Sequence, residues 1–252
     1  MSADLTNRAE RLRALHHGDE MLVLPNVWDA ASAAVVAEAG FAAIATASAA
    51  VSAMLGYPDG EGAPWREMFA AAGRIARAVD LPVTVDAEAG YGLAPRELVG
   101  RLLEIGAVGC NLEDADHRAG GLVDAGVHAE RLAAIRAAAR DAGVPIVVNA
   151  RTDTFLPRSG VPAQERVAET IRRGRRYLEA GADCVYPIGV SDQRDIAALV
   201  SELPGPVNAN TGPADLDLAK LRELGVARVS YGPRFYRQAL ANFTAAVHEL
   251  LV

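Results

Sequence analysis

The segment Glu104-Ile-Gly-Ala-Val-Gly-Cys-Asn-Leu-Glu-Asp114 combines the end of a helix with a short buried strand. Gly106 suits the left-handed residue that commonly ends a helix, and the apolar run Val108–Glu113 predicts a short buried strand. The same helix-end phrase recurs as Glu38-Ala-Gly-Phe-Ala42, Asp141-Ala-Gly-Val-Pro145, Glu179-Ala-Gly-Ala-Asp183 and Glu223-Leu-Gly-Val-Ala227. Each repeat marks a point at which a helix turns into the next strand.

Short apolar strands alternate with longer amphipathic helices along the rest of the chain. The predicted strands are Met21–Val27, Phe41–Thr46, Pro82–Ala87, Val108–Glu113, Pro145–Thr152, Cys184–Ile188, Pro206–Asn210 and Arg228–Tyr231. Eight such units and an N-terminal helix predict an α/β fold, a single (β/α)8 TIM-type barrel over residues 1–252 without a linker. An open doubly wound sheet is the alternative, but no strand is followed by the G-x-G-x-x-G pattern of dinucleotide-binding turns.

Charge and composition exclude several classes of protein. The chain carries 25 Lys+Arg against 32 Asp+Glu, a formal charge of −7, so we expect no nucleic-acid or anionic-membrane surface. The apolar runs are too short to span a membrane, and Met1–Arg13 has no apolar signal core. Cys110 and Cys184 lie in apolar stretches, which is typical of buried thiols in a reducing compartment. These features favour a soluble cytoplasmic protein.

The chain contains a single lysine. Lys220 lies in a polar-faced helical segment, Asp215–Glu223, and we expect it at the surface. Schiff-base chemistry and phosphate-binding P-loops both need a lysine at the site. Lysine-dependent aldolases, pyridoxal-phosphate enzymes and P-loop ATPases are therefore poor candidates.

Long loops and acidic residues gather where the central strands end. Barrel enzymes carry their chemistry on the loops that follow the strands, and three of these are predicted to be long: Ala47–Pro64, Ala115–His128 and Asp153–Pro162. Strand alternation places on the barrel interior the side chains of Asp86, Glu88, Asn111, Glu113, Asn149, Arg151 and Asp153. Clustered carboxylates need a compensating cation, and oxygen ligands with few histidines indicate Mg²⁺ or Mn²⁺.

The motif Asp86-Ala-Glu-Ala-Gly-Tyr-Gly92 resembles the Asp-x-Asp-x-Gly-Tyr-Gly signature of the isocitrate lyase/phosphoenolpyruvate mutase superfamily, with Glu88 in place of the second Asp. Further matching pieces are Leu55-Gly-Tyr-Pro-Asp59, Asn111-Leu-Glu-Asp114 and Asn149-Ala-Arg-Thr-Asp153. The resemblance extends from Leu24 to about Pro233.

The resemblance implies a cofactor, a substrate class and a set of site residues. Mg²⁺ would contact Asp86, with its water shell held by Asp59, Glu88 and Glu113. The substrate would be a 2-oxo acid or a related carboxylate, bound through the segment Thr46-Ala47-Ser48 and through Asn210, with Arg151 steadying charge on its reacting half. The resemblance also implies that the last helix packs against a neighbouring subunit, in a homodimer or homotetramer.

The loop after the fourth strand departs from the lyase pattern. Lyases of this family carry a Lys-Lys/Arg-Cys-Gly-His segment there, with the cysteine as general acid/base, whereas this loop contains neither lysine nor cysteine. The departure argues against isocitrate or methylisocitrate cleavage by the usual mechanism. The mutase pattern of the family, which also relies on a lysine in this loop, is missing too. His117 and Arg118 are the groups near the start of this loop suited to proton transfer or anion binding. The candidate catalytic residues are therefore Arg151, Glu113 and His117.

The leading hypothesis is a Mg²⁺-dependent enzyme that cleaves or forms a C–C bond beside a 2-oxo acid through an enolate. Oxaloacetate-type decarboxylation suits the loop best, because it needs metal stabilisation but no cysteine acid, and retro-aldol cleavage of a substituted malate is also open. The alternatives are P–C bond chemistry on phosphonopyruvate or phosphoenolpyruvate, and a non-catalytic 2-oxo acid binder. His16, His17 and His248 lie in the terminal helices and are expected at the surface.

Overall fold

The strands form one closed ring of parallel pairs in the computed structural model, which describes residues 2–210 and 217–251. They are β1 (Leu22–Leu24), β2 (Asn26–Val27), β3 (Ile44–Thr46), β4 (Val83–Asp86), β5 (Gly109–Glu113), β6 (Val147–Thr152), β7 (Cys184–Pro187), β8 (Asn208–Asn210) and β9 (Arg228–Ser230). One hydrogen-bonded run extends from β2 to β7, and a second joins β1, β9 and β8. A parallel bridge between Val185 and Val207 links the two runs on one side.

Pro25 explains why the first predicted strand is divided in two. Proline has no N–H to donate to a neighbouring strand, and it separates β1, which pairs with β9, from β2, which pairs with β3. Because β1 and β2 are consecutive pieces of the same strand, the ring closes through them. The predicted TIM-type barrel is confirmed, and all of its expected strands are present.

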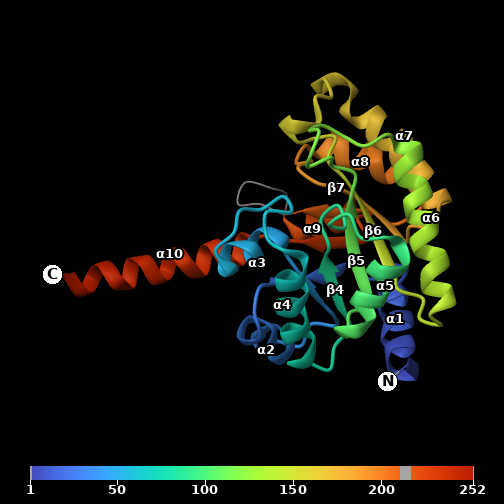
Figure 1. Cartoon of the computed structure of the whole chain (residues 1–252). Coiled ribbons are helices and arrows are strands. Elements are labelled where there is room, and N and C mark those ends of the chain that lie inside the picture. The colour runs from blue at the N-terminus through green and yellow to red at the C-terminus, as the bar shows by residue number, and fades with distance from the viewer. Residues whose placement is uncertain (1, 211–216, 252) are drawn as a thin grey trace.

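Helices alternate with the strands along the chain, and all of them except the last lie around the barrel (Figure 1). They are α2 (Ala30–Glu38), α3 (Ser48–Leu55), α4 (Trp65–Arg77), α5 (Pro95–Glu104), α6 (Ala125–Asp141), α7 (Arg166–Glu179), α8 (Gln193–Glu202), α9 (Leu218–Glu223) and α10 (Arg234–His248). Short 3-10 turns occur at Pro157–Ser159, Ala163–Glu165 and Glu249–Leu251. Helix α3 lies inside the stretch Ala47–Pro64 that the sequence predicts as a loop, so that prediction was wrong in part. Residues 215–216 of the predicted segment around Lys220 lie outside the described residues.

The N-terminal helix α1 (Ser2–His16) packs against the ends at which the strands begin. Arg13 donates to the carbonyl oxygens of Pro145 and Ile146 at 2.9 and 3.1 Å and to the carboxylate of Asp183 at 2.8 Å. His16, expected at the surface, is instead 2% exposed, and its Nε2 lies 3.3 Å from the guanidinium of Arg228. The last turn of α1 therefore faces the interior of the barrel, which amphipathic patterning of this polar helix did not predict.

Helix α10 extends away from the barrel (Figure 1). Its residues are exposed along almost the whole length, including the large apolar side chains of Phe235, Leu240, Phe243 and Val247. Cys110 and Cys184 are free and fully buried, as predicted. Within residues 2–210 and 217–251, no helix is long and apolar enough to cross a membrane.

Candidate active site

A cavity of about 370 Å³ opens at the ends of the strands. It is lined by five residues that the sequence selects, namely Ala47, Ser48, Asp59, Asp86 and Arg151. It is also lined by Asn111, which strand alternation places on the barrel interior, and by residues that no sequence pattern indicated, namely Asn26, Ala49, Leu156, Arg158, Tyr186, Ile188, Ser230, Gly232, Pro233 and Arg237. The predicted convergence of acids and an arginine at one barrel mouth is therefore present.

Asp86, the last residue of β4, is held in place by the segment that follows β3. The Ser48 N–H donates to Asp86 Oδ2 at 3.1 Å, and the Asp86 N–H donates to Thr46 Oγ1 at 2.9 Å. Ala47 is the N-cap of α3. The Ser48 N–H is given to Asp86 and the Ala50 N–H donates to the Ala47 carbonyl at 3.1 Å, which leaves the Ala49 N–H without a partner among the described residues. The segment 46–48 thus orients the carboxylate and presents a helix N-terminus to the cavity.

Glu88 lies behind Asp86 and is turned toward the loop that carries Asp59. Strand β4 ends at Asp86, and Glu88 has a φ of 48°, so the alternation expected of a strand does not extend to it. Its Oε1 accepts from the Tyr91 hydroxyl at 2.6 Å, and its Oε2 accepts from the Glu61 N–H. Burial raises the pKa of Glu88 to about 7. Both carboxylate oxygens of Glu88 are therefore engaged by protein donors.

Glu61 and Tyr91 complete this arrangement. The Tyr91 N–H donates to Glu61 Oε1 at 2.5 Å, and both residues have positive φ values, 58° for Glu61 and 54° for Tyr91. Residues other than glycine rarely adopt this left-handed backbone conformation. Three of them, Glu61, Glu88 and Tyr91, contact one another here, which indicates backbone strain that the surrounding structure maintains. The group joins the turn after β4 to the loop on which Asp59 lies.

Arg151 lies between two carboxylates. Its Nη1 is 2.6 Å from Glu113 Oε2, while its Nε and Nη2 donate to the two oxygens of Asp153 at 2.7 and 3.1 Å. Strand register places Arg151 opposite Glu113, and both belong to the group that strand alternation assigns to the barrel interior. Burial raises the pKa of Glu113 above its usual value, with Arg151 opposing the shift, whereas Arg151 lowers the pKa of Asp153 against the effect of its burial. The guanidinium is thereby fixed at the cavity wall.

His117 contacts the same glutamate from the loop after β5. Its Nε2 lies 2.5 Å from Glu113 Oε1, and this hydrogen bond raises the pKa of His117 above its usual value. On its other side the ring is close to Gly60, where an added Cβ would lie 3.3 Å from His117 Nδ1. His117 and Glu113 are brought together behind the cavity wall, but neither of them lines the cavity.

Asn210 does not line the cavity itself but contacts a residue that does. Its Nδ2 donates to the hydroxyl of Tyr186 at 2.9 Å, and it is Tyr186 that lines the cavity. Burial raises the pKa of the Tyr186 phenol to about 12. Asn210 is therefore placed to orient a hydroxyl at the site.

Two arginines were missed by the sequence analysis. Arg158, in the loop after β6, donates to Asp153 through Nε at 3.1 Å, and its Nη2 lies 3.7 Å from Glu113 Oε1. Arg237, in the first turn of α10, lines the same cavity, and its side chain has no ion-pair partner in the described part of the chain. The sequence holds one signal for Arg158, its place in a long loop after a strand, and none for Arg237.

The residues at the cavity fit a magnesium ion that keeps most of its water. Asp59 and Asp86 face the cavity with oxygen ligands, the type that Mg²⁺ prefers. Among residues 2–210 and 217–251, no group of three His, Cys, Asp or Glu side chains is close enough to form an all-protein metal site. Mg²⁺ is commonly held by one or two carboxylates with several waters, so the donor set fits this ion better than zinc.

Comparisons with known proteins define the class to which this barrel belongs. A family model described as phosphoenolpyruvate phosphomutase matches residues 12–251. The chain therefore belongs to this family, within the isocitrate lyase/phosphoenolpyruvate mutase superfamily, as its motifs predict. It is 37% identical over 234 residues to an uncharacterized protein of Mycobacterium tuberculosis, covering 93% of this chain and 85% of that protein. It is 27% identical over 254 residues to an oxaloacetate decarboxylase of Bradyrhizobium diazoefficiens, covering 97% and 84%.

Solved structures show the same architecture. A candidate phosphonomutase from Burkholderia cenocepacia is similar with a TM-score of 0.90 and 42% identity, covering 97% of this chain and 99% of that one. A phosphonopyruvate hydrolase in complex with oxalate and Mg²⁺ is similar with a TM-score of 0.85 and 26% identity, covering 96% and 86%. The superfamily relatives thus include both lyases and enzymes of P–C bond chemistry, and this chain has the fold of an enzyme of that superfamily.

Proposed function

We propose that this protein is a Mg²⁺-dependent enzyme that cleaves a C–C bond beside a 2-oxo carboxylate, with decarboxylation of an oxaloacetate-type substrate as its reaction. The observation that carries the proposal is the placement of Asp59 and Asp86 together with Arg151 around one cavity. A bound Mg²⁺ would act there as a Lewis acid on the 2-oxo group, and Mn²⁺ would serve in the same way.

The residues of the chain would bind and orient the substrate around that ion. The N-terminal turn of α3 would offer the backbone N–H of Ala49, which lines the cavity, to the 2-oxo carboxylate. Arg151 has terminal N–H groups beyond those given to Glu113 and Asp153, and these would donate to negative charge that develops on the substrate. Glu113 and His117 would hold a proton next to Arg151, within the network that their 2.5 Å contact defines.

Loss of carbon dioxide fits the available groups better than a lyase reaction that needs an acid on the loop after β5. The loop lacks the cysteine and lysine of the lyase segment. The lysine of the chain, Lys220, lies on α9 and is 3.0 Å from Glu223 there, away from the cavity residues. The similarity to an oxaloacetate decarboxylase supports the same choice. Retro-aldol cleavage of a substituted malate would use the same cavity and stays open.

Arg158 and Arg237 suit a substrate with a second anionic group. Both line the cavity, and Arg237 has no carboxylate partner in the described residues to neutralise it. A guanidinium that faces a cavity without a partner favours a carboxylate or phosphonate there. These two residues would distinguish dianionic 2-oxo acids from pyruvate-like monoanions.

A second candidate is P–C bond chemistry on phosphonopyruvate. The similarity to a phosphonopyruvate hydrolase and to a candidate phosphonomutase favours it, and the arginines would bind a phosphonate as well as a carboxylate. The loop after β5 lacks the lysine that the mutase pattern uses, which places this reaction second.

A substrate panel tests the proposal. The purified protein is mixed with oxaloacetate, 2,3-dimethylmalate and phosphonopyruvate, with Mg²⁺ or with excess chelator, and pyruvate and phosphate release are followed. Free metal ions decarboxylate oxaloacetate, so the matched background is the Asp86→Ala variant at the same metal concentration. Mg²⁺-dependent pyruvate release from oxaloacetate above that background supports the proposal. Phosphate release from phosphonopyruvate, or its conversion to phosphoenolpyruvate followed in the same samples, supports the second candidate. Ligand-induced thermal stabilisation without turnover would indicate a binder instead.

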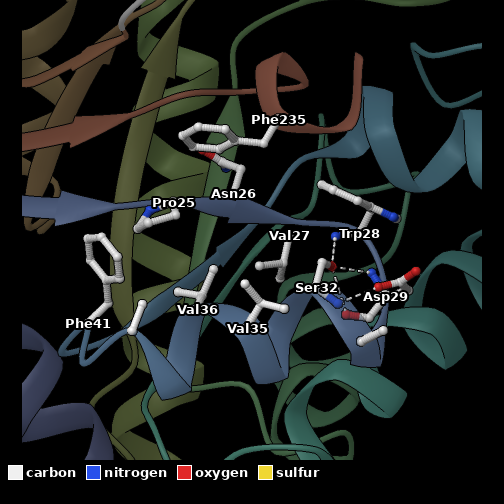
Figure 2. A pocket seen from close by; sticks show the side chains of 12 residues that line it. Pro25, Asn26, Val27, Trp28, Asp29, Ser32, Val35, Val36, Phe41 and Phe235 are labelled. Carbon is white, nitrogen blue, oxygen red and sulfur yellow. Dashed lines mark hydrogen bonds between the residues drawn. The ribbon is translucent and has the colours of Figure 1, made fainter. Parts of the chain in front are cut away.

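The same proposal extends to the assembly. An apolar groove of about 500 Å³ lies along α2 and is lined by Trp28, Val35, Val36, Phe41 and Phe235 (Figure 2). Helix α10 carries exposed Leu240, Phe243 and Val247 at three- and four-residue spacing, and these have no neighbour within the described chain to bury them. We expect α10 of one subunit to cover the groove of another, in a homodimer or homotetramer.

Size-exclusion chromatography with light scattering measures the mass of the assembly directly. Phe243→Glu should shift the mass toward the 26.4 kDa monomer, because a buried charge in an apolar interface is costly. Gln238→Glu, a charge change on the same helix, is the control. A monomeric wild-type protein would contradict the assembly without affecting the metal-site proposal.

A further inference from the structure

Arg228 is a buried cation without a carboxylate partner. It lies on β9 with an exposed fraction of 0%, and within the described residues it forms no salt bridge. Its guanidinium lies 3.3 Å from His16 Nε2 and donates to Asn111 Oδ1 at 3.2 Å, while its Nε has no hydrogen-bond partner in the described structure. Burying an unpaired charge costs free energy of folding, so an arginine at this position suggests a functional reason for it.

Arg228 determines which way the amide of Asn111 points. Asn111 Oδ1 accepts from Arg228 and also from Asn149 Nδ2 at 2.8 Å. Asn111 and Asn149 alone could exchange donor and acceptor by turning both amides over. Arginine has donors and no acceptor, so the reversed amide would set two donors against each other. Arg228 therefore keeps Asn111 Oδ1 turned toward Arg228 and Asn149. The NH₂ group of Asn111 is then the part of the amide that is left without a partner in the described residues.

That NH₂ group belongs to a residue of the cavity. Asn111 lines the cavity, and strand register places it opposite Asp86, so the two side chains lie on neighbouring strands of the same barrel mouth. Asn111 Nδ2 has no acceptor among the described residues, Asp86 included. The structure thus presents an oriented, uncharged donor beside the carboxylate that would hold the metal.

We propose that Asn111 donates a hydrogen bond from Nδ2 to a carboxylate or enolate oxygen of the bound 2-oxo acid, and that Arg228 is the positioning residue for this donor. The inference rests on the proposed function, because it needs a 2-oxo acid in this cavity. A preorganised donor beside developing negative charge stabilises it without adding charge of its own. Removal of such a donor typically costs about tenfold or more in affinity for the anion.

Binding of oxalate, a stable mimic of the enolate of pyruvate, tests the inference without turnover. Mn²⁺ replaces Mg²⁺, so that the free ion can be counted by electron paramagnetic resonance, and oxalate affinity is then measured by calorimetry at saturating Mn²⁺. Asn111→Leu keeps the branched shape of the side chain and removes the donor, and Asn111→Ala, which also has no donor, serves if the leucine variant does not fold. Thr84→Val is the matched control, a buried substitution inside the barrel at a hydroxyl without a partner.

We expect Asn111→Leu to keep Mn²⁺ affinity and to bind oxalate about tenfold or more weakly. Arg228→Met should weaken oxalate binding in the same direction, and Arg228→Lys, which keeps a charged donor, should restore part of it. Thr84→Val should match the wild type in both measurements. Wild-type oxalate affinity in folded Asn111→Leu or Asn111→Ala would overturn this inference and leave the proposed function standing. Absence of Mn²⁺-dependent oxalate binding by the wild-type protein would overturn the proposed function and this inference with it.

Discussion

The Ser48 N–H donates to Asp86 Oδ2 across 3.1 Å, which joins the end of β4 to the first turn of α3. The residue proposed to hold the metal and the helix proposed to hold the substrate carboxylate are therefore one hydrogen-bonded unit. This hydrogen bond orients the Asp86 carboxylate before any ion binds. A preorganised site of this kind can stabilise the charge that develops during the reaction.

Asp86→Asn keeps an oxygen for Ser48 and removes the charge. We expect Mn²⁺ affinity and Mg²⁺-dependent activity to fall by about 100-fold or more, because the loss of a direct carboxylate ligand weakens Lewis-acid stabilisation. The melting temperature should change little. Calorimetry and activity with added metal are the measurements, and wild-type metal affinity in this variant would remove Asp86 from the metal site.

Arg151→Lys replaces a planar fork with a point charge. The arginine contacts Glu113 at 2.6 Å and both oxygens of Asp153, and an ammonium group cannot reach these partners together. We expect kcat/KM to fall by about 100-fold or more, at a melting temperature only a few degrees lower. Steady-state kinetics and thermal melts check this, with Arg140→Lys on α6 as the surface control. Activity close to wild type would contradict the role assigned to Arg151.

Arg237→Gln should affect substrates selectively. Since the guanidinium faces the cavity without a carboxylate partner in the described chain, its loss should raise KM for dianionic substrates by about tenfold while kcat and the KM of monoanionic substrates stay the same. Arg234→Gln is the control, because Arg234 lies 5.9 Å over the Tyr231 ring and does not line the cavity. An equal KM change for both substrate classes would contradict a role in recognising the second anion.

His128→Phe should make stability less sensitive to acid. His128 is buried edge-on against Tyr177 at 4.9 Å, and burial lowers its pKa to about 3. The unfolded chain binds this proton near pH 6.5, so the contribution of neutral His128 to stability is complete above that pH and is lost as the pH falls toward 3. Between pH 6 and 4, the free energy of unfolding measured in urea should fall by about 1.4 kcal/mol more per pH unit for the wild type than for the variant. Parallel curves for the two proteins would show that His128 does not titrate this way, and His17→Gln, at an exposed histidine, controls for the charge.

The sequence predicted those features that depend on strand periodicity. Alternation along β5 and β6 brought Glu113 and Arg151 together, and their register pair confirms it. Proline and glycine patterns located the strands correctly, although the break at Pro25 and the helix α3 were not expected.

Features that depend on turns and on distant segments could not be predicted in this way. Glu88 leaves the strand at a positive φ, so its partners Glu61 and Tyr91 follow from backbone conformation and not from spacing. His16 is buried because α1 packs against the ends at which the strands begin. The polar sequence of α1 does not predict this tertiary contact. Arg237 reaches the cavity from a helix that otherwise extends away from the barrel.

A crystal structure of the protein grown with Mn²⁺ and oxalate, with the metal located by its anomalous scattering, would show directly whether Asp86 holds the metal. We expect one Mn²⁺ peak in the cavity, within coordination distance of Asp86 Oδ, with both oxalate oxygens on the ion. A metal bound away from Asp86, or oxalate bound in the cavity without a metal, would exclude the proposed metal site.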